Sequence, residues 1–174
     1  VVSLTLDSYL KECGFNADRV VNPCGTYEKL QCVNGCENSL CSSETLLLEF
    51  DKLLFGFKAN DCIGQEEVLA FVEKCYTLLT EYKCSDCNAS MCFNHLDSGK
   101  YCEAGYLEQW QKYMKWLQGT LNHRLCVIEA GVGMKLPSVI RWPFEKTVFY
   151  NQKSNMFRIH NKFYQINEEV AQRA

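Results

Sequence analysis

Hydrophobic residues along this chain form two kinds of pattern, short apolar runs and stripes with helical spacing. Short apolar runs predict strands at 1–6, 17–22, 124–131 and 156–160. The segments 27–33 and 90–95 are also expected to form short strands. Helical stripes predict amphipathic helices at 43–55, 65–80 and 106–118. Caps and breakers add expected helices at 8–13, at 137–151 and after 167. The clearest stripe places Val68, Val72, Cys75 and Leu79 at steps of four, three and four, which predicts one buried face.

Caps and breakers define the ends of these elements. Asp7 and Asn167 stand where side-chain caps of helices are expected. Ser42 or Ser43 is expected to cap a further helix, which Gly56 is predicted to end. Pro143 is predicted either to kink the helix after Pro137 or to mark its true start. The segment FYQI at 163–166 reads as a short strand or a turn.

Four cysteines form two pairs with metal-ligand spacing. Cys32 and Cys36 make one pair, and Cys84 and Cys87 make the other. Two tight turns that each present two thiolates complete a tetrahedral Zn²⁺ shell when they face one another. The alternatives are disulfides or scattered core thiols, and the chain is long enough to build a core without disulfides. The spacing therefore predicts a structural zinc site.

The run at 124–131 is almost continuously apolar, as in parallel strands covered by helices on both faces. Strand, glycine turn, helix and strand make half of a doubly wound unit, in which ligands bind beyond the carboxyl ends of the strands. Gly131, Val132 and Gly133 follow the strand at that position. The third glycine of a G-x-G-x-x-G fingerprint is replaced by Leu136, so the spacing leaves both a nucleotide contact and a plain tight turn open.

Together these patterns predict an α/β fold, a partial Rossmann-like parallel sheet with an inserted zinc-ribbon and helical module. The expected boundaries are 1–26 and 105–174 for the Rossmann-like domain and 27–104 for the small domain. The chain has 174 residues and opens Val1-Val2 without an initiator Met or a signal peptide, from which we expect a fragment that begins inside a strand.

Composition limits the partners and the compartment. A net charge of −3 argues against general binding to nucleic acid. Apolar runs fall short of the roughly 18 residues that a membrane span needs, so we expect no membrane segment. Twelve cysteines, of which the best spaced form a metal site, suit a reducing compartment. We therefore expect an intracellular protein of the cytoplasm.

Six segments, in order and with suitable spacing, resemble the second half of a sirtuin. They are VSLTLD, GFNADRV, CGTYEKLQCVNGC, KCSDCNASM, VIEAGVGMKLPSVIRWPFE and FRIH. The fifth segment is most similar to the microbial sirtuins associated with protein ADP-ribosylation. The resemblance implies an NAD-dependent protein deacylase or ADP-ribosyltransferase, with NAD and zinc as cofactors and an acylated or ADP-ribose-accepting protein as its substrate.

The resemblance also assigns residues. The cysteine quartet matches the family's zinc ligands, residues 131–133 fall where the family holds the ribose and phosphates, and His160 falls where many members have an Asn near the adenosine. Thr5 stands where the family has the Asn that meets the nicotinamide ribose, while the nearby family Asp is retained as Asp7. Cys24 stands at the general-base position, which is His in deacylases and Gln in the ADP-ribosylating group.

A cysteine lacks the second nitrogen that lets histidine relay a proton, and its thiol titrates higher. The resemblance therefore favours NAD binding or ADP-ribosyl transfer over deacetylation. Two alternatives stay open, a catalytically inactive NAD-binding relative and a zinc-ribbon interaction protein that binds no nucleotide. Cys24 as a nucleophile would need a neighbouring cation, and the sequence places no histidine beside it.

Overall fold

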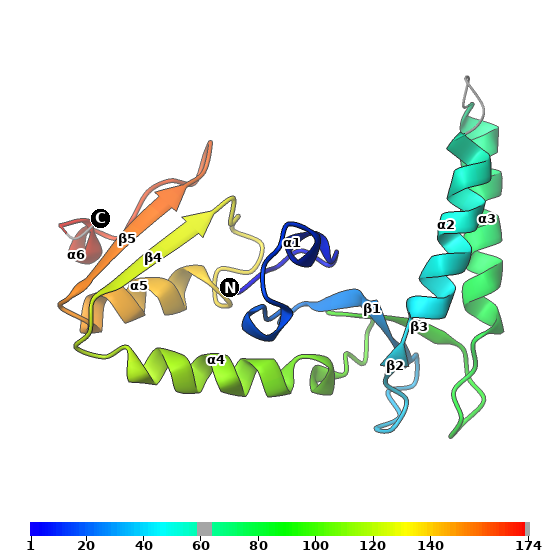
Figure 1. Ribbon diagram of the computed structural model, residues 1–174, viewed down its shortest axis with the longest axis horizontal. Helices are drawn as coiled ribbons and strands as arrows, with labels where there is room; N and C mark the ends of the chain where they lie inside the picture. Colours follow the sequence, from blue (N-terminus) through cyan, green and yellow to red (C-terminus); the bar gives the residue numbers. More distant parts are fainter. Residues whose placement is uncertain (59–63, 173–174) are drawn as a thin grey trace.

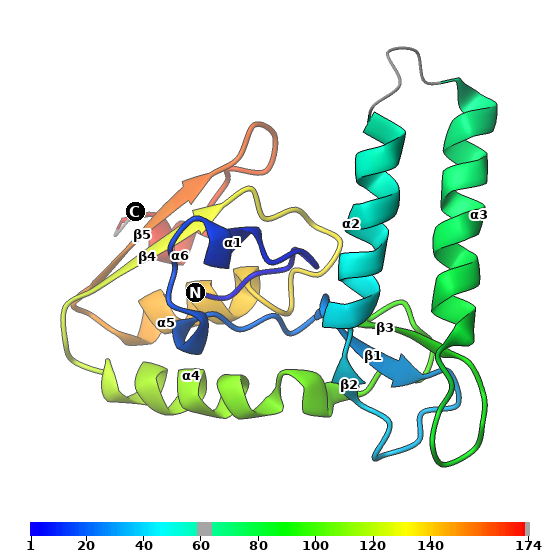
Figure 2. The ribbon, with the colours of Figure 1, turned by 45° about the vertical axis from the view of Figure 1, so that its right-hand side comes forward.

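The computed structural model describes residues 1–58 and 64–172. Within these residues the chain forms two small sheets, an antiparallel sheet in the order β2-β1-β3 and a parallel pair, β4 and β5. The two sheets lie at opposite ends of the molecule (Figure 1). Helix α4 (Leu107–Gly119) runs along one side between them (Figures 1 and 2). This mixed α/β architecture with a small parallel sheet agrees with the predicted class at that level.

The antiparallel sheet is centred on β1 (Gly25–Cys32), which pairs with β2 (Cys41–Ser42) and β3 (Met91–His95). Helices α2 (Glu44–Lys58) and α3 (Gln65–Glu81) stand side by side and project away from this sheet (Figure 2). The residues of these helices that reach the core of the sheet lie in the first turns of α2 and the last turns of α3. The core there consists of Leu30, Cys32, Leu46, Cys84 and Met91, with Phe50 and Leu79 packed against it.

Two fully buried amides fasten the segment after β3 to this sheet. The Gln31 side chain donates to the carbonyl of Lys100 at 2.9 Å and accepts the Cys102 N–H at 2.9 Å. Asn94 donates to the Gln31 amide oxygen at 2.6 Å and to the Cys102 carbonyl at 2.9 Å. Buried side-chain amides are as a rule hydrogen-bonded, and these four bonds fix the path of the chain into η2 (Glu103–Gly105) and α4.

The parallel pair consists of β4 (Leu125–Ala130) and β5 (Ser154–Ile159). Helices α5 (Arg141–Tyr150) and α6 (Glu168–Ala171) pack on one face, around Val127, Val148, Met156 and Val170. The prediction that both faces are covered is wrong. Along each strand alternate side chains turn to the other face, where Ile128, Phe157 and Ile159 remain exposed.

The predicted strands at 1–6 and 17–22 are also wrong. The two segments share a single parallel bridge between Val2 and Val21, which is too short for a ladder. The Asn16 side chain accepts the Asp18 N–H at 2.8 Å and starts a turn of 3₁₀ helix, η1 (Ala17–Arg19), in place of extended backbone. Asp7 does bond the start of α1 (Tyr9–Glu12), because its carboxylate accepts the Tyr9 N–H at 3.1 Å.

Two further expectations about helix limits need correction. Gly56 does not end α2, which continues to Lys58, because a glycine inside a helix costs only about 1 kcal/mol relative to alanine. Helix α5 begins at Arg141, so Pro143 lies in its first turn, where a missing N–H is tolerated. Residues 163–166 form neither a helix nor a strand.

The remaining predicted elements are present within a few residues of their expected limits. Asn167 caps α6 as predicted, accepting the Glu169 N–H at 2.9 Å. Among the helices that the structure describes in residues 1–58 and 64–172, none combines the length and apolar character required to span a bilayer.

Candidate metal centre and adjoining cavities

The two cysteine pairs meet in space. The sulfurs of Cys32, Cys36, Cys84 and Cys87 all lie within 4.8 Å of one another, and those of Cys32 and Cys87 are 3.5 Å apart. A tetrahedral Zn²⁺ with sulfur bonds of about 2.3 Å needs sulfurs about 3.8 Å apart. The arrangement is compatible with a zinc ion, and within the described residues it is the one cluster of this kind.

Each cysteine pair sits on a turn that needs a left-handed residue. In the first turn Gly35 has φ +72° and donates its N–H to the Cys32 carbonyl at 2.9 Å. In the second turn the residue after the pair, Asn88, has φ 57° and donates to the Cys84 carbonyl at 2.9 Å. Glycine and asparagine are the residues that adopt this conformation most readily. Both turns therefore bring their two sulfurs to the same side of the chain.

Gly35→Ala is expected to destabilise the protein by about 1–2 kcal/mol, because an L-residue resists positive φ. A Cβ at this position would also lie 2.9 Å from the Lys100 Cβ. Urea unfolding of the zinc-loaded protein measures the change. Gly119→Ala, at a helical position with open space around it, is the control and should not lower the midpoint. Equal losses from the two changes would contradict this account of the turn.

The hydrogen bonds to the sulfurs of the quartet and the pKa values of Cys36 and Cys87 favour binding of a metal cation. The Asn34 backbone N–H donates to the Cys32 sulfur at 3.3 Å, and its side-chain amide donates to the Cys87 sulfur at 3.7 Å. The backbone N–H of Ala89, followed by the neighbouring thiols, lowers the pKa of Cys87 to about 6. Hydrogen bonding to Cys87 and Cys32 raises the pKa of Cys36 to about 12. Without a metal the quartet cannot readily carry four thiolates, and a divalent cation would relieve their mutual repulsion.

The position of the quartet indicates a structural role. Cys32 and Cys84 are buried and belong to the core of the antiparallel sheet, whereas Cys87 is exposed. A shell of four thiolates leaves no open position for a substrate. A metal held here would tie the end of β1 to the turn that precedes β3.

A second feature is a cavity of 540 Å³ between the N-terminal segment and β4. It is lined by Thr5, Asp7 and residues 131–133, so the structure brings together the two groups that the sequence named separately. The Thr5 hydroxyl lies 3.4 Å from the Asp7 carboxylate and 2.9 Å from the Ser3 hydroxyl. These polar groups face a wall formed by the turn that follows β4.

The turn after β4 is open on its inner side. Gly131 has φ +68° and donates its N–H to the Ile159 carbonyl at 2.9 Å. A Cβ added at Gly131 or Gly133 would meet no atom of the protein within 4 Å. Neighbouring protein atoms therefore do not require glycine at these two positions. The space beside the backbone is available to a ligand.

A buried network of ion pairs between β4, β5 and α5 contacts the backbone of this turn. Glu129, on β4, is 1 % exposed and pairs with Arg158 of β5, whose Nε lies 2.7 Å from its carboxylate. Arg158 also contacts Glu145 at 2.8 Å. Arg141 lies 3.4 Å from Glu129 and donates to the carbonyls of Val132 at 3.4 Å and Phe163 at 2.7 Å. The network thus links the strand to the backbone of the glycine turn.

Cys24 lines a smaller cavity of 220 Å³ beside the 540 Å³ cavity. Leu4 and Gly133 line both cavities. His95 and Asp97 line it too, because Gly25 pairs with His95 across β1 and β3. This proximity could not be predicted from the sequence, since it depends on pairing between segments about 70 residues apart. Burial, with a smaller contribution from Asp97, raises the pKa of the Cys24 thiol. A neutral thiol is a poor nucleophile.

His160 does not line either of these cavities. Its Nδ1 accepts the N–H groups of Lys162 and Phe163, both at 2.9 Å, and its ring lies 5.0 Å from that of Phe163. The residue follows β5 directly, at the same edge of the sheet as Gly131. In this arrangement its side chain shapes the loop after β5.

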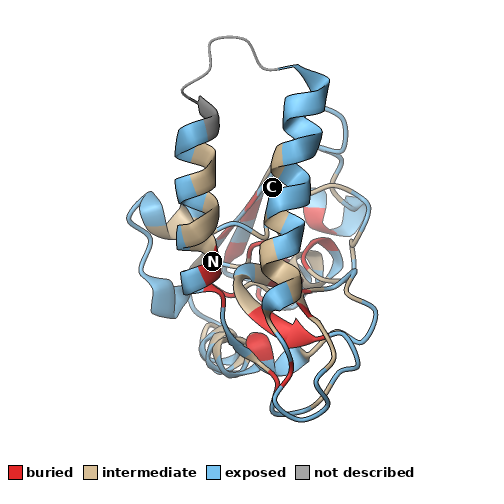
Figure 3. Cartoon of the chain, turned by 90° about the vertical axis from the view of Figure 1, so that its right-hand side faces the viewer, coloured by how far each residue is buried: buried red, intermediate tan, exposed pale blue. Residues whose placement is uncertain are grey.

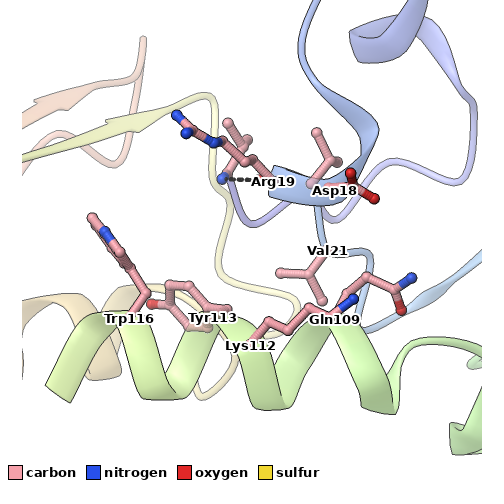
Figure 4. Close-up of a pocket in the computed structure, with 9 residues that line it drawn as sticks. Asp18, Arg19, Val21, Gln109, Lys112, Tyr113 and Trp116 are labelled. Atoms are coloured by element: carbon pink, nitrogen blue, oxygen red, sulfur yellow. Dashed lines mark hydrogen bonds between the residues drawn. The ribbon is translucent and has the colours of Figure 1, made fainter. Parts of the chain in front are cut away.

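A further cavity of 350 Å³ separates residues 18–21 from α4. Figure 4 shows Val21 pointing toward the helix, where the Tyr113 and Trp116 rings lie next to one another. Arg19 and Lys112 bring positive charge to its rim. None of the residues predicted to bind zinc or cofactor lines this cavity.

Neither a scan of protein-family models nor a search of curated proteins gives a match to this chain. The physical arrangement of the site therefore carries the functional argument.

Proposed function

We propose that this chain binds NAD in the 540 Å³ cavity, as the carboxyl-terminal part of a sirtuin-like NAD-dependent protein ADP-ribosyltransferase or deacylase with a structural zinc. The observation that carries the proposal is that Thr5, Asp7 and the turn 131–133 line one cavity. The sequence resemblance assigned these residues to NAD independently of any structure. Backbone without side chains at Gly131 and Gly133 leaves room for ribose and phosphate oxygens.

In this proposal each group has a role that its chemistry allows. The hydroxyl of Thr5 and the carboxylate of Asp7 hydrogen-bond the hydroxyls of the nicotinamide ribose, and the turn at 131–133 contacts the phosphates and the adenosine ribose. NAD supplies an ADP-ribosyl group when nicotinamide leaves. The four cysteines, Cys32, Cys36, Cys84 and Cys87, hold Zn²⁺ away from this chemistry and stabilise the small module.

The state of Cys24 favours ADP-ribosyl transfer over deacylation. Its thiol is buried, its pKa is raised and it occupies the position of the family's base. A buried neutral thiol cannot take a proton from a ribose hydroxyl as a histidine does. The second candidate function, a catalytically inactive protein that binds NAD, is favoured by the same observation.

Calorimetric titration of the zinc-loaded chain with NAD and with ADP-ribose tests the proposal. We expect saturable binding of both ligands, and we expect Gly133→Ala to weaken it at least tenfold, about 1.4 kcal/mol, because a methyl group would enter the ligand's space. Gly119→Ala, at the end of α4 and outside the lining of the cavity, should bind like the original protein. Failure of both ligands to bind would refute the proposal.

Chromatographic assay of nicotinamide separates the two candidate functions. Release of nicotinamide that depends on a protein acceptor supports a transferase. Binding of NAD without release supports the inactive protein.

A further inference from the structure

Helix α3 carries an apolar stripe that the rest of the described chain does not cover. The periodicity predicts a buried face through Val68, Val72, Cys75 and Leu79, and this prediction is wrong for the outer half of the helix. Val68 is 42 % exposed and Val72 is 54 % exposed, while Cys75 and Leu79 near the base are partly buried. Leu69 and Tyr76, which neighbour them on the helix surface, are 54 % and 67 % exposed.

We call Val68, Leu69, Val72 and Tyr76 the α3 stripe. Val68, Val72 and Tyr76 follow at intervals of four residues, so they lie above one another on one side of the helix. Figure 3 shows most of α3 in the colour of exposed residues. Contiguous apolar patches on a soluble protein commonly mark an interaction site.

Negative charge accompanies this stripe. Residues 44–56 and 65–81 contain seven carboxylates and two lysines, although the whole chain has a net charge of only −3. Glu66 and Glu73 lie three residues before and four residues after Leu69, so they border the stripe on one side. Among the ion pairs of the described residues, neither glutamate takes part in one.

We propose that the α3 stripe binds an amphipathic helix of a partner protein, with apolar residues at helical spacing and Lys or Arg beside them. An exposed apolar helix face is suited to pack against a second helix, and the row of Glu66 and Glu73 favours a basic partner. A second copy of this chain would bring like charges together, and an anionic lipid surface would be repelled for the same reason. This inference goes beyond NAD binding and does not depend on it.

The probe is a fluorescent 18-residue helical peptide of Leu, Lys and Ala, with leucines on one face, and its binding to the zinc-loaded chain is followed by anisotropy. We expect saturable binding, and we expect Val72→Gln with Tyr76→Gln to weaken it at least tenfold. Both replaced side chains are exposed, and glutamine is a good helix former. Circular dichroism verifies that α3 remains folded.

Charge variants separate recognition at α3 from general attraction. Glu66→Gln with Glu73→Gln should weaken binding several-fold and reduce its salt dependence. The control is Glu44→Gln with Asp51→Gln on α2, which removes the same charge at the same spacing of seven residues and should change the affinity little. A peptide of the same composition with leucines distributed around the helix should bind much more weakly.

Three results would overturn the proposal. They are absence of saturable binding, equal binding of the two peptides, and equal losses in the two charge variants. Sedimentation of the chain without peptide tests the other occupant, because concentration-dependent dimers that disappear in the Val72→Gln, Tyr76→Gln variant would assign the stripe to a second copy instead.

Discussion

Replacing Cys84 with serine is expected to abolish stoichiometric zinc binding and to unfold the antiparallel module around β1. Cys84 is buried in the core of this module, and its sulfur is one of the four that converge. Structural zinc sites contribute apparent free energies of about 10–16 kcal/mol to folding, which is comparable to the whole stability of a domain, about 5–15 kcal/mol. Metal analysis and thermal unfolding followed by circular dichroism measure both effects.

The control for this change is Cys41→Ser. Cys41 is exposed on β2 and does not belong to the quartet, so its replacement should alter stability by no more than about 0.5 kcal/mol. A chelator added to the original protein should reproduce the loss of structure seen with Cys84→Ser. Unchanged unfolding of Cys84→Ser, or an original protein that contains no zinc and unfolds cooperatively, would contradict a structural metal centre.

The quartet could be predicted from the sequence because its information is local. Spacing within each pair, and a residue that tolerates positive φ at Gly35 and Asn88, are visible without a structure. The two pairs lie far apart in the sequence. They are expected to meet because four thiolates together can complete the shell of one metal ion. Strands β4 and β5 were predictable for a similar reason, since their apolar runs are bounded by turn residues.

Other structural features depend on which segments pack against one another. The periodicity of apolar residues does not contain this information. The pattern of Val68 and Val72 indicates an apolar face, but only the structure shows that nothing in the described chain covers it. The run at 1–6 has the composition of a strand, yet a single bridge is all that it forms with 17–22. The approach of Cys24 and His95 follows from β1–β3 pairing. In each case tertiary contacts decide the outcome.

The ion network below the glycine turn was only partly visible in the sequence. Glu129 interrupts an apolar strand, which marks it as a buried carboxylate that needs a partner. Its partners, Arg158 and Arg141, come from β5 and α5. The chain order of these elements does not reveal that two arginines converge on one carboxylate, because that depends on the parallel register of Glu129 opposite Arg158.

Replacing Glu129 with glutamine should lower the free energy of unfolding by about 3–5 kcal/mol, the cost of removing one partner from a buried charge pair. The side chains of Arg158 and Arg141 are 1 % and 6 % exposed, so neither can recover its solvation by turning to water. Urea unfolding measures the change. Glu108→Gln, which breaks the exposed pair with Lys112 on α4, is the matched control and should cost at most about 0.5 kcal/mol.

The same substitution is expected to weaken binding of NAD under conditions where the variant is still folded. Arg141 joins Glu129 to the Val132 carbonyl, so loss of the carboxylate frees the guanidinium that holds the glycine turn in place. A turn that must be ordered by the ligand binds it less tightly than one already in position. If Glu129→Gln were destabilised as expected but bound NAD with unchanged affinity, the network would serve the stability of the sheet and not the shape of the cavity.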